Sequence, residues 1–345
     1  MRAVHSCRFV ISGFDLMEVV QRKSSPSLTR RGLMLGGVGL ASSALWSCGG
    51  GGSGGDGGGG GAGGGGSAQP TGSLVYRNSS VVGVYSFTGQ TELRFDPGAQ
   101  PDVKTGMAAS RSGVLAASRA GTTSTNFVIA LFGLDGKLST SYRVERELSF
   151  QTSAAVFNAD ASRIAFSVDE PRSTTDGTRI ARTLIAALPS GNIIARIDGY
   201  EEPVWLGSGG ELLVSNPQDN SLRLFDASFR DQGRFGDFVV SGLVGDYDAS
   251  ADGRYVVYGN GGNEIMAYDR STATRWMAAQ APTSSLVSAT LSPNGSQVAL
   301  LASTFASYTP HVLPFTNGVK VTVDQNVHAL RNTLLQCSGR MGWAS

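Results

Sequence analysis

Four carboxylates in two short clusters are the residues of this sequence best suited to chemistry. Glu201 and Glu202 stand directly before a proline, and Asp246 and Asp248 flank a tyrosine. Paired carboxylates can hold a calcium ion or act as a general acid and base. The other interpretation is that they are solvated acids in turns, because no second set of ligands accompanies them at a fixed spacing. We therefore expect no cofactor, with calcium at these four residues as the alternative.

Histidine and cysteine add little to these acids. His311 follows a proline at the start of an expected strand and His328 lies in an expected connecting loop, so we expect both to be structural or exposed. No cluster has the spacing of zinc ligands, and no Gly-x-Ser-x-Gly motif is present. The sequence therefore favours a binding protein over an enzyme.

Both acidic clusters lie at the start of copies of a repeated hairpin, and this repeat determines the expected fold. The clearest copies are residues 289–300, with an Asn-Gly turn, and residues 247–258, with an Asp-Gly turn. Asn-Gly and Asp-Gly tolerate positive φ, so each copy predicts two short strands joined by a tight turn. Weaker copies follow the same plan, and the turns recur at roughly 40 to 50 residues, the period of a four-stranded propeller blade. These weaker copies are residues 107–116, 156–166 and 204–214.

The two ends of the repeat region complete each other. The first unit, from residue 72, lacks an innermost strand, and residues 339–345 align with the missing piece. Mixing strands from both ends in one sheet closes a circular propeller. We predict an all-β, six-bladed propeller over residues 72–345, built of four-stranded antiparallel blades. The expected blades are 72–99 with 334–345, then 101–145, 146–199, 200–240, 241–282 and 283–330.

Two of the repeats resemble a known family. Residues 292–299, Ser-Pro-Asn-Gly-Ser-Gln-Val-Ala, and residues 249–256, Ala-Ser-Ala-Asp-Gly-Arg-Tyr-Val, are similar to the Ser-Pro-Asp-Gly repeat of the six-bladed propeller of TolB and its WD-like relatives. The resemblance covers about residues 72–345 and implies a propeller that binds other proteins. The chain departs from the family in having no helical domain before the propeller and no Trp-Asp dipeptide.

Residues 1–47 have the features of an export signal. Arg30 and Arg31 lie in a Thr-Arg-Arg-Gly-Leu-Met-Leu stretch that resembles a twin-arginine motif, the alternative being the basic region of a general secretory signal. The true start is Met1 or Met17. Leu-Trp-Ser-Cys at residues 45–48 resembles a lipobox, so cleavage would leave Cys48 to carry lipid. We expect an exported protein of a bacterial cell envelope, anchored through Cys48 on the periplasmic or outer face of a membrane.

Residues 48–71 are rich in glycine and predict a flexible tether between the lipid and the folded domain. After cleavage Cys337 is the one cysteine besides Cys48, so no internal disulfide is expected. The whole chain has 28 basic and 27 acidic residues, and without residues 1–47 it has 22 and 25. Nothing in this balance indicates nucleic acid as a partner.

These features together predict a monomeric, non-catalytic scaffold that binds an unidentified protein or cell-envelope ligand. Connecting loops at residues 200–202 and 235–238 offer acidic and aromatic groups for such a surface. The alternative is a propeller hydrolase or lyase with a metal bound at the central channel.

Overall fold

The fold comes from a computed structural model that describes part of the chain. The described residues are 69–78, 81–96, 107–109, 113, 115–120, 127–144, 155–171, 179–240, 247–282, 285–304, 307–324, 327–330 and 341–345. All of them belong to one compact unit, and every regular element among them is a β-strand. No helix able to cross a membrane occurs in this part of the chain. Arg30, Arg31, Cys48 and Asp246 lie outside the described residues.

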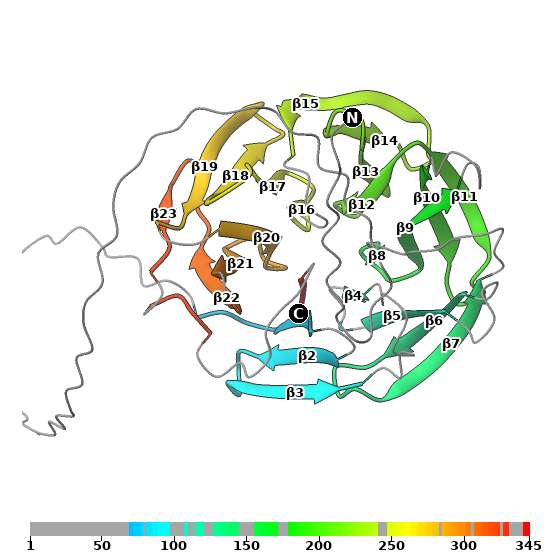
Figure 1. The fold of residues 1–345 in the computed structure, drawn as a ribbon, viewed down its shortest axis with the longest axis horizontal. Helices are drawn as coiled ribbons and strands as arrows, with labels where there is room; N and C mark the ends of the chain where they lie inside the picture. The colour runs from blue at the N-terminus through cyan, green and yellow to red at the C-terminus, as the bar shows by residue number, and fades with distance from the viewer. Residues whose placement is uncertain are drawn as a thin grey trace, which may run out of the picture. The chain divides into compact units, whose positions relative to one another are not determined.

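The strands form six small sheets arranged in a propeller-like ring (Figure 1). Sheet 1 combines β24 (Gly342–Ala344) with β1 (Ser73–Asn78), β2 (Val81–Ser86) and β3 (Thr91–Phe95). Sheet 2 contains β4 (Met107–Ala109), β5 (Leu115–Ala120), β6 (Phe127–Phe132) and β7 (Leu138–Val144). Sheet 3 contains β8 (Ala155–Phe157), β9 (Arg163–Pro171), β10 (Arg179–Ala187) and β11 (Ile193–Asp198).

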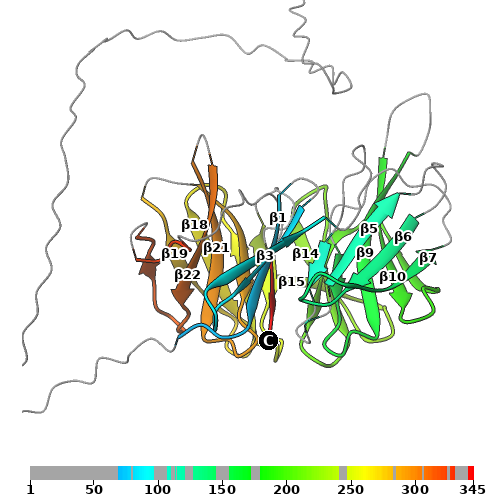
Figure 2. The same ribbon diagram turned by 90° about the horizontal axis from the view of Figure 1, so that it is seen from below.

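The remaining sheets follow the same order from the axis outward. Sheet 4 contains β12 (Glu201–Leu206), β13 (Glu211–Ser215), β14 (Ser221–Phe225) and β15 (Asp231–Val239). Sheet 5 contains β16 (Tyr247–Ala249), β17 (Tyr255–Gly259), β18 (Glu264–Asp269), β19 (Thr274–Gln280) and, in parallel with β19, β23 (Val321–Thr322). Sheet 6 contains β20 (Ser285–Leu291), β21 (Gln297–Thr304) and β22 (Ser307–Pro314). Seen from the side, the strands run roughly along the axis of the ring (Figure 2).

The all-β architecture of small antiparallel sheets in a ring is confirmed, but the prediction of six four-stranded blades is wrong. Five sheets have at least four strands, whereas sheet 6 has three among the described residues. The fourth strand of sheet 6 was expected after the turn that follows β22. The strand found there, β23, pairs instead with β19 of sheet 5. The amide of Val323 also donates to the carbonyl of Gln280 in sheet 5, at 2.7 Å.

Two prolines explain why sheet 6 ends early. The amide of Val312 donates outward to the carbonyl of His328 at 3.0 Å, so the even-numbered residues of β22 present their backbone groups away from β21. Pro310 and Pro314 occupy two of these positions and have no N–H to offer a fourth strand. Residues 327–330 therefore join β22 through a single bridge, in which the amide of Leu330 donates to the carbonyl of Pro310 at 2.9 Å.

The predicted closure of the ring by both ends of the repeat region is confirmed. β24 pairs antiparallel with β1, so that Trp343 lies opposite Leu74 and becomes part of the innermost strand of sheet 1. The indole N–H of Trp343 donates to the carbonyl of Thr71 at 2.9 Å, and its ring stacks on Phe87 with centroids 5.0 Å apart. The chain ends near the axis of the ring (Figure 1).

The repeated hairpin turns share one hydrogen-bond pattern, which explains the residue types of the repeat. In the turn from Ser250 to Tyr255, the Ser250 hydroxyl accepts from the amide of Tyr255 at 2.8 Å, and Asp252 accepts from the amide of Arg254 at 3.0 Å. Ser292 and Asn294 do the same in the turn of sheet 6, and Asn158 and Asp160 in the turn of sheet 3. The fourth residue of each turn has positive φ and is Gly253, Gly295 or Ala161.

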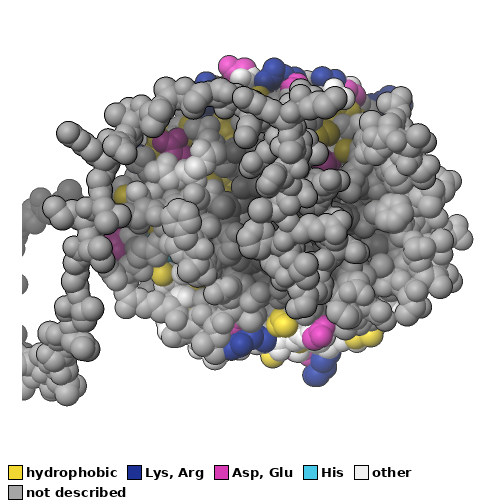
Figure 3. Space-filling model, in the orientation of Figure 1, with side chains coloured by type: hydrophobic (Ala, Val, Ile, Leu, Met, Phe, Trp, Pro, Cys, Tyr) yellow, Lys and Arg dark blue, Asp and Glu magenta, His cyan; other side chains and the backbone are white. Residues whose placement is uncertain are grey.

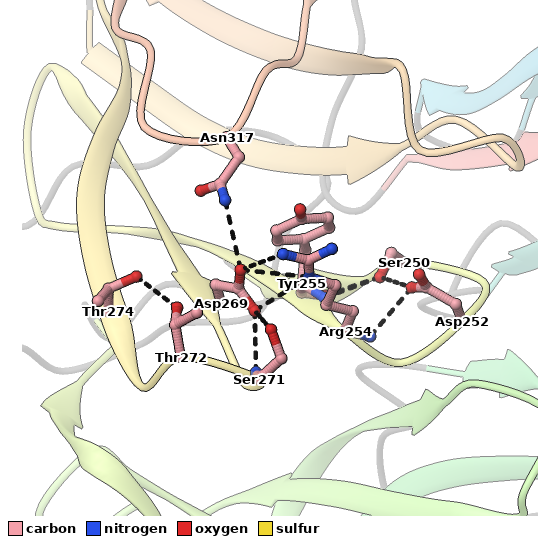
Figure 4. A network of polar contacts seen from close by, with 9 residues as sticks. All are labelled: Ser250, Asp252, Arg254, Tyr255, Asp269, Ser271, Thr272, Thr274 and Asn317. Atoms are coloured by element: carbon pink, nitrogen blue, oxygen red, sulfur yellow. Dashed lines mark hydrogen bonds and ion pairs between the residues drawn. The ribbon is translucent and has the colours of Figure 1, made fainter.

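A buried carboxylate, Asp269, pairs with the partly exposed Arg254 within sheet 5 and is linked by Asn317 to the chain after β22. Asp269 has no exposed side-chain surface and accepts hydrogen bonds from Arg254 at 2.7 Å, from the amide of Ser271 at 2.9 Å and from Asn317, beyond the end of β22, at 3.4 Å (Figure 4). The hydrogen bonds from Arg254, followed by those from Ser271, hold the pKa of Asp269 well below its ordinary value. Asp269 is therefore ionised whenever the domain is folded near neutral pH.

Candidate functional site

The innermost strands surround a small cavity at the axis of the ring. Neighbouring inner strands contact one another in the order β24, β4, β8, β12, β16 and β20, and β20 returns to β24. The cavity has a volume of about 80 Å³, and its lining includes Val156, Trp205, Asp248, Thr290 and Trp343. Because ligand sites usually have about 300 to 1,000 Å³, this space suits a few water molecules or one ion.

Asp248 is the predicted acid that lines this cavity, and its carboxylate joins two sheets. One oxygen of Asp248, on β16, accepts from the hydroxyl of Thr290 at 2.7 Å and from the amide of Leu291 at 3.0 Å, both on β20. Thr290 and Leu291 are buried, so without Asp248 their hydroxyl and amide donors would have no hydrogen-bond partner from the protein or from water. Asp248 is thus a cross-link between sheets 5 and 6 and not a solvated acid in a turn.

Glu201 and Glu202 lie at the start of β12, away from the cavity lining. Leu206 pairs with Glu211 and Ala249 pairs with Val256, and each pair is the last one before the hairpin turn of its sheet. Trp205 and Asp248 each come one residue before such a pair, so they lie at the same level along the axis. Glu202 comes three residues before Trp205, which is up to about 10 Å along a strand. The structure therefore does not bring Glu201 and Glu202 to the level of Asp248.

Glu202 itself occupies an unusual position. It is 8% exposed, has a φ of +54° and lies in a β-bulge of sheet 4. Its amide donates to the hydroxyl of Ser167 in sheet 3 at 2.7 Å, and its carbonyl accepts from the phenol of Tyr247 in sheet 5. Its backbone thus connects three sheets, which accounts for the persistence of a strained φ at a non-glycine residue.

The calcium hypothesis stays a prediction. No group of three or more His, Cys, Asp or Glu side chains able to hold a metal occurs among the described residues. Of the predicted acids that the structure describes, Asp248 lines the cavity, whereas Asp246 lies outside the described residues.

A second, larger space lies between sheet 1 and sheet 6, and we call it the side groove. It has a volume of about 390 Å³ and is lined by Tyr85, Phe87 and Gln90 of sheet 1, by Gln297 and residues 312–314 of sheet 6, by residues 327–330, and by Gln69 and Pro70. This volume lies within the usual range of ligand sites. In the part of the chain that the structure describes, β22 has no full fourth strand beside it, and the groove lies next to this edge of sheet 6.

The two histidines of the domain lie beside the side groove. His311 has no exposed surface, and its Nδ1 lies 2.9 Å from the carbonyl of Thr309, so it is structural as expected. His328 is half-buried, and its Nδ1 accepts from the amide of Asp324 at 3.0 Å, which places the proton of the neutral ring on Nε2. Burial, reinforced by His311 and opposed by Asp324, lowers the pKa of His328.

The aromatic groups expected in a connecting loop at residues 235–238 are buried in a strand. These residues belong to β15, and Phe235 and Phe238 are 5% and 3% exposed. Phe238 stacks on Tyr258 of sheet 5 with centroids 4.4 Å apart, so the aromatic groups are core. Sequence reasoning also missed the side groove. Pro310 and Pro314 are four residues apart in one strand and were a signal for an incomplete sheet edge.

The described surface beside β15 has no charge of a single sign. Basic and acidic side chains are intermixed along this rim (Figure 3), where Arg223 and Asp231 form an ion pair. This mixture agrees with the balanced charge of the whole chain.

Compared with models of protein families and with curated proteins, the chain matches none. The resemblance to the TolB repeat therefore stays a prediction from the motif.

Proposed function

We propose that this chain is an exported, non-catalytic envelope lipoprotein whose propeller binds a ligand or a protein. The observation that carries the proposal is the side groove, a space of about 390 Å³ at a sheet edge, which is larger than the central cavity of about 80 Å³. Ligand binding needs room for the ligand, and the side groove has it. The export motif at Arg30 and Arg31, Cys48 and the glycine-rich tether support a position at a membrane.

We further propose that the domain is a six-bladed propeller related to that of TolB, with sheet 6 as a blade whose outer strand is reduced to residues 327–330. The closed succession of inner strands and the Ser-Pro-Asn-Gly turn support this count. A crystal structure with five inner strands around the axis would contradict it.

The anchor is tested by fractionating cells that produce the full-length chain. The wild-type chain should sediment with membranes. Cys48→Ala should release the chain to the soluble envelope fraction. The double variant Arg30→Lys, Arg31→Lys should retain the chain in the cytoplasm. Membrane retention of Cys48→Ala would contradict lipidation at this residue.

Binding is tested by a photo-crosslinking amino acid placed in the full-length chain in intact cells. Val327 is 72% exposed and lines the side groove, whereas Val239 on β15 is 51% exposed and does not line it. Adducts should form from position 327 and not from position 239. Adducts from both positions, or from neither, would contradict a specific site at the side groove.

The alternative, a hydrolase or lyase with a metal at the channel, requires ligands that converge at the cavity. A calcium titration of the full chain, followed by thermal melting, tests it. Saturable binding that is lost in Asp246→Asn and Asp248→Asn would favour the alternative, since neutral amides bind calcium less well at such a site.

A further inference from the structure

We propose that the ligand of the side groove is a neutral saccharide, held by the amide of Gln90 and the imidazole of His328. This inference rests on the proposed binding function and adds the chemical class of the ligand.

The described lining of the side groove has no fixed charge, since none of the described residues that line it is Asp, Glu, Lys or Arg. The groups there that could ionise are Tyr85 and His328, and burial raises the pKa of Tyr85 while it lowers that of His328. Both are therefore uncharged near neutral pH. Among these described residues a charged ligand would lose its hydration without gaining a partner of opposite charge, so they favour a neutral ligand.

The polar groups of the groove suit hydroxyl groups. Gln69 and Gln90 each carry an amide that both donates and accepts, and His328 offers the N–H of its Nε2. A sugar hydroxyl also donates and accepts, so each amide can be matched by one hydroxyl. Phe87 and Tyr85 lie edge to face with centroids 5.5 Å apart and supply the apolar part of the lining.

Gln90 is held in a strained backbone conformation at the edge of this groove. Its φ is +49° in the turn between β2 and β3, where glycine would be unstrained. A side chain at this position lowers the stability of the turn, so its presence in the lining is consistent with a role in binding.

An extended peptide is a poorer fit than a saccharide. A peptide commonly binds a sheet edge by adding a strand through backbone hydrogen bonds. On β22 the outward donors are missing at Pro310 and Pro314, and the outward groups of Pro310 and Val312 are already bonded to Leu330 and His328. A proline-rich helix that docks on aromatic groups is the remaining peptide mode, and it is the other outcome of the test.

The experiment is calorimetry on the full-length chain in mild detergent, with cellobiose, maltose and N,N′-diacetylchitobiose as neutral disaccharide probes and hexaproline as the comparison. We expect saturable binding of at least one disaccharide. Gln90→Gly should weaken it roughly three- to tenfold, because one hydrogen bond is lost. The same variant should melt at an equal or higher temperature, which excludes unfolding as the cause. Ala161→Gly is the matched control, since it relieves a φ of +56° in sheet 3, outside the groove, and should leave affinity unchanged.

The outcomes separate this inference from the proposed function. Disaccharide binding that Gln90→Gly weakens and Ala161→Gly does not would support the saccharide site. Binding of hexaproline alone, weakened by Gln90→Gly, would overturn the saccharide inference and keep a binding module. Failure of all three disaccharides, or disaccharide binding indifferent to Gln90→Gly, would also overturn it, while crosslinking at Val327 tests the binding function separately.

Discussion

The contact between the hairpin turns of sheets 4 and 5 makes Gly253 the most sensitive position of the repeat. Gly253 has a φ of +71°, and a Cβ there would lie 3.0 Å from the amide nitrogen of Gly207 and 3.2 Å from the carbonyl carbon of Leu206. Gly295 has the same place in the turn of sheet 6 and a φ of +68°, but a Cβ there would meet nothing within 4 Å. The two glycines therefore differ in steric contact and not in backbone conformation.

This difference gives a magnitude for Gly→Ala at each position. The left-handed conformation costs alanine about 1 to 2 kcal/mol. Reduced freedom of the unfolded chain offsets about 0.4 to 1 kcal/mol of this. Gly295→Ala should thus lower the free energy of unfolding by roughly 1 kcal/mol. Gly253→Ala should lower it by about 1 to 3 kcal/mol more, because the Cβ presses on backbone atoms that cannot rotate away.

The assay is thermal melting of the full-length chain and both variants, followed by tryptophan fluorescence. For a domain of this size 1 kcal/mol corresponds to about 2 to 4 °C, so Gly253→Ala should melt roughly 2 to 12 °C below Gly295→Ala. Equal melting temperatures for the two variants would refute the contact between the turns of sheets 4 and 5.

Three further predictions concern the ties between sheets. Asp269→Asn should lower the free energy of unfolding by about 2 kcal/mol at pH 7, because the buried carboxylate loses its charged hydrogen bonds while Arg254 stays partly solvated. Because the folded-state pKa of Asp269 is depressed, the difference in stability between the variant and the wild type should be full above about pH 4 and should shrink as the pH falls further. A difference that stays the same from about pH 7 to pH 3 in thermal melts would contradict the ion pair. Asp248→Ala should cost about 2 kcal/mol, and Asp248→Asn less than half as much, since an amide oxygen still accepts from Thr290 and Leu291; equal losses in denaturant melts would argue against this cross-link. Trp343→Ala should cost about 3 to 5 kcal/mol, and a melting temperature unchanged within 1 °C would argue against closure of the ring by β24.

The sequence predicted those parts of the fold that depend on local turn chemistry. The Ser-x-Asp-Gly and Ser-x-Asn-Gly turns specify their own hydrogen bonds, so strands on both sides of Ser250 and Ser292 could be located from the residues alone. Closure by β24 was predictable for a related reason, because a repeat that lacks one strand at its start and has a spare one at its end suggests a shared sheet.

The candidate site was harder to predict because it depends on register and on contacts between distant segments. Glu202 and Asp248 both appeared to enter inner strands, but three residues of register separate their levels at the axis. A pattern in one strand does not report the neighbour across the sheet, so the hydrogen bonds from Thr290 and Leu291 to Asp248 had no signal in the sequence. The side groove joins residues 69–90 to residues 297–330, and no local pattern connects these segments.

The origin of the side groove nevertheless lies in two residues of one strand. Pro310 and Pro314 remove outward donors from β22, and a fourth strand there would leave its own carbonyls without partners. Among the described residues after β22, β23 joins sheet 5 and residues 327–330 return to sheet 6. A complete outer strand would present side chains over the space that now lies beside Tyr85 and Phe87. Pro310 and Pro314 thus disfavour a full outer strand on β22, and this leaves room for a ligand between the first and last sheets of the ring.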